Sequence, residues 1–319
     1  MVLPDKVNAL KEKFLSELTL NPSSILQYEK VLTIFILWQT KSEFDVTHPT
    51  RATFAKFYNG LKAKDLSSRT IDNYTAIVRK FFKWMIDLDY YDTDITDKVI
   101  PLRRSNDYVK APLPEDKAML LLNHKPDNSV IEVRNHAIIN TMIRIGLRRI
   151  EISRLNVSDI FQVGQQWFIR VHGKGAYQQY DELPITQDIL TPIQNYWKYR
   201  PNLGESDPAF INHARCSSDR ITPHSISVMA KARLRSIGLD SKLFSSHSFR
   251  HTADYFAFKS GSKQIEVQQM LRQRDGRSTE QYLKAFNHEK VKDGAAIFNL
   301  DSYYKKLHRT NKKRNENHI

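Results

Sequence analysis

The apolar residues of the first hundred positions recur every three or four residues, which restricts this part of the chain to packed helices. In NPSSILQYEKVLTIFILWQ, Asn21 is placed to cap a helix that begins with Pro22. The stretch SSRTIDNYTAIVRKFFKWMIDL, which starts at Ser67, repeats the same spacing. Further helices are expected at about 5–18 and 50–63. The sequence therefore predicts a compact, helical N-terminal unit.

The composition changes after this helical unit. The stretch IPLRRSNDYVKAPLPE contains three of the chain's 12 prolines and a cluster of basic residues, which is typical of a linker. A length of 319 residues is also typical of about two domains. We expect a helical domain at 1–104, a linker at 105–112 and a second domain at 113–319.

The second domain combines helices with short β-rich segments. A helix is expected to end at Ile145, with Gly146 as a left-handed cap and another short helix from about Leu147. The segments DIFQV, QWFIRV and YDELPI then predict a small three-stranded antiparallel sheet, followed by helices from about residue 186. The expected fold class is mainly α with a small antiparallel β-sheet.

The charge balance is strongly basic. There are 49 lysines and arginines against 35 acidic residues, which gives a net charge of +14 and a pI near 9.6. This fits a polyanionic partner, with nucleic acid first and an anionic membrane surface second, although solubility alone is an alternative. A single cysteine, Cys216, excludes an intramolecular disulfide. The longest near-apolar run, VLTIFILW, falls short of the ~20 residues of a membrane span, so we expect a soluble, cytoplasmic protein.

Two short stretches place a cationic side chain at a turn. In GLRRIEI, Arg148 follows a glycine-capped turn, and Glu151 three residues later is an alternative ion-pair partner. In VHGKGAYQQY, Lys174 lies between two glycines of an apparent hairpin. The second stretch lacks the fixed length and the Ser/Thr of a nucleotide-binding P-loop, and a solvated turn lysine is the alternative.

A third stretch, SSHSFRHTADYF, would place His247 and Arg250 on one helix face, where they suit a phosphate group. His251 invites a zinc interpretation. However, Ser248 stands where a metalloprotease helix needs Glu, and no cluster supplies further ligands, so metal binding is not favoured. A capped helix with a partly buried histidine is the alternative.

The fourth stretch is LRQRDGRSTEQYL, which ends near Tyr282. A tyrosine hydroxyl, with a free pKa of about 10, becomes a useful nucleophile only when cations stabilise the phenolate. Arg272, Arg274 and Arg277 would add to such a field. The alternative is a half-buried tyrosine on a helix face.

In this order, the four stretches resemble the motifs of the tyrosine recombinase (phage-type integrase) family, over essentially the whole chain. GLRRIEI resembles the first arginine box, HGKG the β-hairpin lysine and HSFRHT the His-x-x-Arg box. Leu271 and Tyr282 keep the spacing of the final box. Two positions depart from the family pattern: Gln273 stands where His or Trp is usual, and Arg272 replaces the glycine of the usual Leu-Gly. Glutamine can donate a hydrogen bond to a phosphate but cannot carry a proton.

The resemblance implies a helical, SAM-like core-binding domain and an α+β catalytic domain. It further implies that a tyrosine attacks a DNA phosphodiester to form a 3′-phosphotyrosyl bond, with no cofactor, neither metal nor ATP. Two arginines would bind the phosphate oxygens, a lysine would protonate the leaving 5′-oxygen, and a histidine would assist proton transfer. The catalytic residues implied in this way are Arg148, Lys174, His247, Arg250, Gln273 and Tyr282.

The implied partner is double-stranded DNA at a specific site, bound by a homo-tetramer on two duplexes, with a monomer compatible with the DNA-free state. The tail after Tyr282 would dock on a neighbouring subunit by the same analogy. The helical unit begins near Met1, so we expect no separate arm-site-binding domain. The candidate DNA contacts are Arg69, Arg79, Lys80, Lys83, Arg272, Arg274 and Arg277.

Two alternatives remain open at this point. A type IB topoisomerase uses closely similar chemistry as a monomer, although the His-x-x-Arg box followed by His251 favours a recombinase. A DNA-binding relative with impaired catalysis is the other alternative, and Gln273 is the residue that supports it. Integration, excision and dimer or transposon resolution are all compatible with the resemblance.

Overall fold

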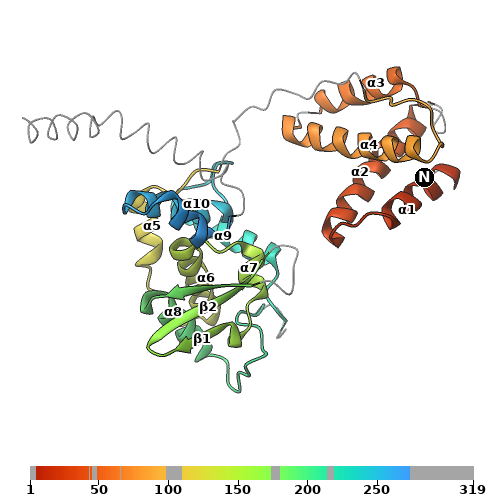
Figure 1. Ribbon diagram of the computed structural model, residues 1–319. Coiled ribbons are helices and arrows are strands. Elements are labelled where there is room, and N and C mark those ends of the chain that lie inside the picture. The colour runs from red at the N-terminus through yellow and green to blue at the C-terminus, as the bar shows by residue number, and fades with distance from the viewer. Residues whose placement is uncertain are drawn as a thin grey trace, which may run out of the picture. The chain divides into compact units, whose positions relative to one another are not determined.

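The computed structural model describes residues 5–42, 44, 49–64, 66–97, 110–173, 180–213 and 219–273. The chain divides into two compact units, Met1–Tyr108 and Val109–Ile319, which are described separately (Figure 1). The expected boundaries around 105–112 remain a prediction, because most of that segment lies outside the described residues.

The first unit is helical, as the apolar spacing predicted. Asn21 caps its second helix by accepting a hydrogen bond from the backbone N–H of Ser24 at 3.0 Å, and Pro22 is the first helical residue. Its core is rich in fully buried aromatic side chains, among them Phe35, Phe54 and Phe82. The described helices are α1 (Asp5–Ser16), α2 (Pro22–Lys41), α3 (Arg51–Lys62) and α4 (Ser68–Asp87).

The second unit combines helices with one sheet. In chain order its elements are α5 (Glu115–Leu122), α6 (Val130–Ile145), α7 (Arg149–Arg154), a 3-10 turn (Val157–Asp159), β1 (Ile160–Val163), β2 (Gln166–His172), β3 (Tyr180–Ile185), α8 (Gln187–Trp197), α9 (Pro223–Ser236), α10 (Ser246–Lys259) and α11 (Gln264–Leu271). The strands form an antiparallel sheet in the order β1-β2-β3. Ile169 at the centre of β2 pairs with Ile160 and Leu183, so the predicted three-stranded sheet is confirmed.

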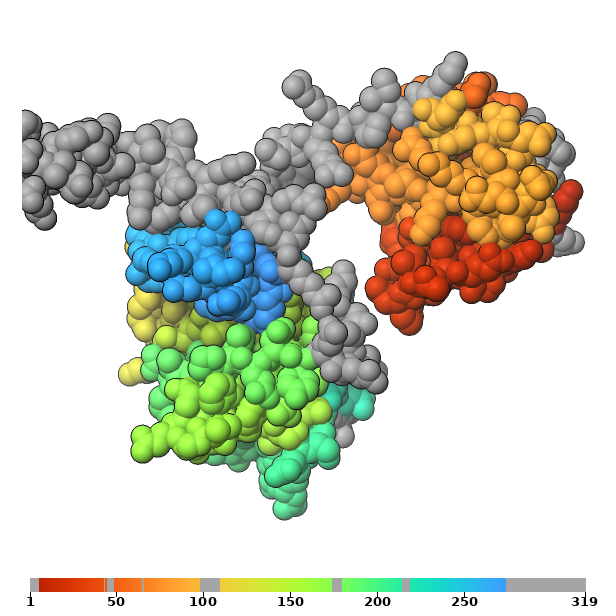
Figure 2. Space-filling model, in the orientation of Figure 1, coloured from red at the N-terminus to blue at the C-terminus, as the bar shows by residue number. Residues whose placement is uncertain are grey.

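Helix α6 runs through the middle of the second unit, with the sheet and α8 towards one end and α10 towards the other (Figure 1). Its central residues, such as Ile138 and Met142, are almost completely buried, so α6 forms the centre of the hydrophobic core. The space-filling view shows α10 and α11 together on the surface, at the end of the second unit opposite the sheet (Figure 2). In the part of the chain that the structure describes, no helix combines the length and apolar character of a membrane span.

Candidate functional site

The turn between α6 and α7 presents the first arginine. Gly146 ends α6 with φ +65° and ψ +31°, as the sequence predicted, and its N–H donates to the Met142 carbonyl at 3.1 Å. Leu147 is completely buried and anchors the turn. Arg148 then takes an extended backbone and caps α7, so this helix begins at Arg149 rather than near Leu147.

Glu151 accepts hydrogen bonds from both the backbone and the side chain of Arg148. Its Oε2 accepts the backbone N–H of Arg148 at 2.7 Å, and its Oε1 accepts the Arg148 Nη1 at 2.6 Å. The carboxylate is completely buried, whereas the Arg148 side chain keeps 30% of its exposure. The ion pair that the sequence suggested as an alternative is therefore present. It leaves the guanidinium partly accessible to a ligand.

Arg250 comes from α10, which begins with a capped turn. Ser245 Oγ accepts the backbone N–H of His247 at 3.3 Å. One turn further, the buried Arg250 donates from Nη1 to the Gly146 carbonyl at 2.5 Å and from Nη2 to the Leu271 carbonyl. Arg250 therefore joins three segments that are far apart in the sequence, namely the α6–α7 turn, α10 and the end of α11.

The cluster of Arg148, Glu151, Arg250 and Arg272, called the arginine cluster below, carries more positive than negative charge. Burial, with repulsion from Arg148, lowers the pKa of Arg250 to about 9. Burial alone would raise the pKa of Glu151, but Arg272 and Arg148 keep it below its ordinary value. Burial raises the pKa of Asp254 to about 7, so this neighbouring carboxyl is only partly ionised at neutral pH. Bound anionic phosphate would supply the missing negative charge.

His247 lies at the exposed end of this cluster. Loss of hydration and the nearby Arg149 and Arg250 lower its pKa, so the imidazole is neutral at pH 7 and one ring nitrogen can accept a proton. Burial likewise lowers the pKa of His251 to about 4. Among the described residues, no group of three His, Cys, Asp or Glu side chains is placed to hold a metal ion.

The last described residues of the final box lie against the same cluster. Leu271 is completely buried, and the Gln273 backbone N–H donates to the Gln268 carbonyl at 3.0 Å. Arg272, which the sequence grouped with the DNA contacts, instead directs a buried guanidinium to Glu151 at 2.7 Å. The DNA-facing role expected for Arg272 is thus not favoured by its geometry.

Outside the described residues lie four of the expected site residues: Lys174, Arg274, Arg277 and Tyr282. The strand that leads to residue 174 is nevertheless held close to α7, because Arg154 Nη1 donates to the Gly173 carbonyl at 2.7 Å.

Sequence reasoning missed two residues near the site, Arg154 and Asp254. Arg154 carries no motif signal, because its carbonyl partner is remote in sequence. Asp254 does carry a signal, because it follows Arg250 by one helical turn and lies among buried neighbours. An acidic residue on the apolar side of a helix is rarely without a partner of its own.

The basic residues of α4 separate into two groups. Arg69, Lys80 and Lys83 are exposed, and their spacing places them on one face of the helix. Arg79 points elsewhere, donating from Nε to the Thr96 hydroxyl and from Nη2 to the Thr96 carbonyl, both at 3.1 Å. The first group remains available for a polyanion, whereas Arg79 has a structural role in the first unit.

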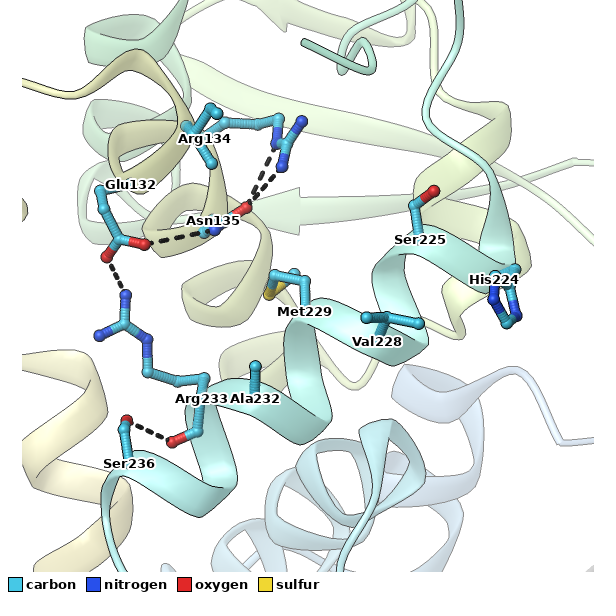
Figure 3. Close-up of a pocket in the computed structure, with 11 residues that line it drawn as sticks. Glu132, Arg134, Asn135, His224, Ser225, Val228, Met229, Ala232, Arg233 and Ser236 are labelled. Atoms are coloured by element: carbon cyan, nitrogen blue, oxygen red, sulfur yellow. Dashed lines mark hydrogen bonds and ion pairs between the residues drawn. The ribbon is translucent and has the colours of Figure 1, made fainter. Parts of the chain in front are cut away.

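A pocket of about 520 Å³ lies between the start of α6 and α9, and it does not include the arginine cluster (Figure 3). Several of its charged and polar side chains bind one another. Arg233 pairs with Glu132, and Arg134 Nη2 donates to Asn135 Oδ1 at 2.8 Å (Figure 3). In the pocket wall Glu132 pairs with Arg233. In the arginine cluster Glu151 faces three guanidiniums, which makes this cluster the stronger candidate for an anion site.

Two family models match this chain. Residues 113–289 match the phage integrase family, and residues 7–87 match the phage integrase N-terminal SAM-like domain. The first match covers more than half of the chain. It includes every stretch that carries an expected catalytic residue.

Individual relatives are more distant. A putative integrase/recombinase, y4rA of Sinorhizobium fredii, is 25% identical over 83% of this chain and 64% of its own length. Tyrosine recombinase XerC of Neisseria meningitidis is 25% identical over 75% of this chain and 76% of its own.

Solved structures share the fold. The XerH recombinase bound to a palindromic difH substrate has a TM-score of 0.70 at 16% identity, over 86% of this chain and 80% of its own. The Tn1549 transposon integrase in complex with transposon right end DNA has a TM-score of 0.66 at 15% identity, over 86% and 94%. Together, the family and structural matches confirm the expected family, fold class and enzyme class. The chain belongs to the phage integrase family, the tyrosine recombinases.

Proposed function

We propose that this protein is a site-specific recombinase that cuts and rejoins double-stranded DNA through a covalent 3′-phosphotyrosyl intermediate. The observation that carries the proposal is the excess of guanidinium charge over carboxylate charge around the buried Glu151. Arg148, Arg250 and Arg272 converge there, while Glu151 is the fully buried carboxylate that offsets them. A phosphodiester is an anion whose oxygens match the planar hydrogen-bond donors of arginine.

The reaction begins with attack on phosphorus. The hydroxyl oxygen of Tyr282 forms a bond to the scissile phosphorus, and the bond from phosphorus to the 5′-oxygen breaks. Lys174 donates a proton to that leaving oxygen, and neutral His247 accepts the phenolic proton or holds the phosphate. The assignments of Tyr282 and Lys174 rest on their motifs. Because the phosphotyrosyl bond retains the phosphodiester's energy, the reverse attack by a 5′-hydroxyl rejoins the strand.

Arg148 and Arg250 stabilise the charge that develops on the non-bridging oxygens. The protein holds these two arginine side chains in different ways. Arg148 keeps part of its surface accessible, whereas Arg250 is buried and held by two backbone carbonyls. The buried arginine therefore needs little reorganisation when the phosphate binds. Gln273, at the end of α11, would donate a hydrogen bond to the phosphate in place of the usual histidine or tryptophan.

The proposed partner is duplex DNA at a specific target site. The exposed basic face of α4 supports this partner, as does the Tn1549 integrase structure, which is a complex with transposon DNA. Four subunits would act on two duplexes, with the tail after Tyr282 docked on a neighbour. The cytoplasmic location expected from the sequence remains part of this proposal.

The test starts with duplexes selected from a random-sequence pool by binding to the wild-type protein. Selected sites are then built as nicked suicide substrates, from which the short leaving strand diffuses away and traps the intermediate. We expect a denaturant-resistant protein–DNA adduct that is lost in Tyr282→Phe. If the wild-type protein forms no adduct on any selected site, the enzymatic proposal is wrong and a DNA-binding role replaces it.

A second assay separates recombination from relaxation. Two selected sites are placed on one supercoiled plasmid, and the products are compared with those of a plasmid carrying no site. Strand exchange between the sites supports a recombinase. Relaxation of both plasmids without exchange would instead indicate a topoisomerase.

A further inference from the structure

Arg272 has a backbone conformation that arginine rarely adopts. It ends α11 with φ +52° and ψ +48°, a left-handed position at which helices usually have glycine. The other non-glycine residues with positive φ in the described part of the chain are Asp89 and Asn202, whose short polar side chains tolerate it. The long arginine side chain does not compensate in that way, so an interaction of its guanidinium with another part of the chain is expected to offset part of the strain.

That interaction is a buried ion pair. The Arg272 side chain is 5% exposed, and its Nη2 donates to Glu151 Oε2 at 2.7 Å. Its Nη1 donates to the Met270 carbonyl at 2.7 Å, which holds the guanidinium over the end of its own helix. The ion pair is thus almost fully removed from water, where a charged hydrogen bond is strong and an unpaired charge is costly.

The same carboxylate holds Arg148. Oε2 of Glu151 is shared between the Arg148 backbone N–H and Arg272, while Oε1 binds the Arg148 guanidinium. Arg272 is also the strongest opposing charge that keeps the pKa of the buried Glu151 low, once burial has acted to raise it. Without Arg272, Glu151 would lose one of the partners that orient it.

The turn formed by Arg272 also reaches the second arginine. The carbonyl of the preceding residue, Leu271, accepts a hydrogen bond from Arg250 Nη2. The conformation of this turn therefore determines where that carbonyl points. One side chain is linked to Arg148 through Glu151 and to Arg250 through the backbone.

We propose that Arg272 is a positioning residue of the cleavage site, which orients Arg148 through the buried Glu151 carboxylate. The inference rests on the proposed function, and it explains why arginine stands where the backbone favours glycine. It also assigns Arg272 a role in the protein interior rather than at the DNA surface.

Arg272→Gly is the informative variant, because it relieves the backbone conformation while removing the ion pair. A residue that only caps α11 would be replaced by glycine without loss. A positioning residue predicts that DNA affinity is retained while the rate of adduct formation on the selected suicide duplex falls about 100-fold, the effect of small misplacement at a reacting centre. Asn202→Gly, the same backbone change at an exposed site, is the matched control and should react as the wild type does.

Two further measurements exclude simple loss of structure. In a Glu151→Gln background, adding Arg272→Gly should change the rate far less than in the wild type, since the shared carboxylate is already gone. The charge of Arg272 is the second part of the test, because it is the strongest counter-charge of Glu151. Arg272→Lys should recover part of the rate by keeping that charge.

The outcomes are separable. If the wild type reacts and Arg272→Gly reacts at the same rate, the positioning role is wrong and the proposed function stands. If the wild type forms no adduct, the proposed function fails and this inference fails with it.

Discussion

Gly146 lies directly against Leu271, so that a Cβ atom on Gly146 would be 2.4 Å from the Leu271 Cδ2. This contact joins the turn before Arg148 to the end of the helix that leads towards Tyr282. It exists because Gly146 combines a left-handed backbone with the absence of a side chain. The same Cβ would lie 3.5 Å from the Cγ of Arg250, which donates to both the Gly146 and Leu271 carbonyls.

Gly146→Ala should therefore be doubly unfavourable. The positive φ costs about 1 kcal/mol for alanine, and the overlap with Leu271 adds roughly 1–3 kcal/mol as the core shifts. Gly164→Ala is the matched control, because Gly164 has a φ of +60° with no atom within 4 Å of the added Cβ. Thermal unfolding should show a clearly larger loss for Gly146→Ala. Equal losses would contradict the close packing.

Arg250→Lys should reduce adduct formation by about 100-fold or more, although the charge is kept. Lysine cannot reproduce the planar fork that binds two carbonyls and a phosphate together. The measurement is the single-turnover rate on the suicide duplex. Arg235→Lys, at an exposed ion pair with Asp240, should leave this rate unchanged. A wild-type rate for Arg250→Lys would remove Arg250 from the phosphate site.

His247 should set the low-pH limit of cleavage. Its pKa is below the ordinary value because of lost hydration and of Arg149 and Arg250, so the ring is neutral at pH 7 and becomes protonated only at lower pH. The rate should fall as the pH drops through that lowered pKa. His247→Gln should react about 100-fold more slowly and without this limb. The exposed His224→Gln serves as control, and an unchanged pH profile in His247→Gln would exclude the proton-transfer role.

Asp254 should make stability depend on pH. Its folded-state pKa of about 7 lies above the unfolded value, so the stability it contributes is fully present below about pH 4 and lost as the pH rises to about 7. Relative to Asp254→Asn, the wild type should lose on the order of 4 kcal/mol across that window.

Thermal unfolding of both proteins from pH 4 to pH 8 measures this difference. Asp116→Asn, at an exposed site on α5, provides the control. A difference between wild type and Asp254→Asn that stays constant with pH would contradict the raised pKa.

Lys83→Ala should weaken DNA binding without unfolding the first unit, because the side chain is exposed on α4. Removing one lysine–phosphate interaction reduces the slope of log affinity against log salt by about 0.9. Titrations of a selected duplex at several salt concentrations check this. Arg79→Ala should instead destabilise the unit, since Arg79 holds Thr96. An unchanged slope in Lys83→Ala would place the DNA elsewhere.

The sequence by itself determined the elements and the family. Helical spacing, the cap formed by Asn21 and Pro22, the Gly146 turn and the three β segments are local properties, and each was confirmed. Arg148 and Arg250 were selected from their motifs, since the order and spacing of short boxes can be read along the chain without knowledge of contacts.

Only the tertiary structure decided which charged side chains work together. The sequence suggested that Arg272 and Arg79 are exposed basic residues. In the structure, Arg272 is buried against Glu151 and Arg79 donates a hydrogen bond to Thr96. Asp254 becomes a perturbed carboxyl only because α10 is buried on that side. Such roles depend on desolvation and on partners up to 121 positions away, as for Arg272 and Glu151, and local sequence patterns carry neither.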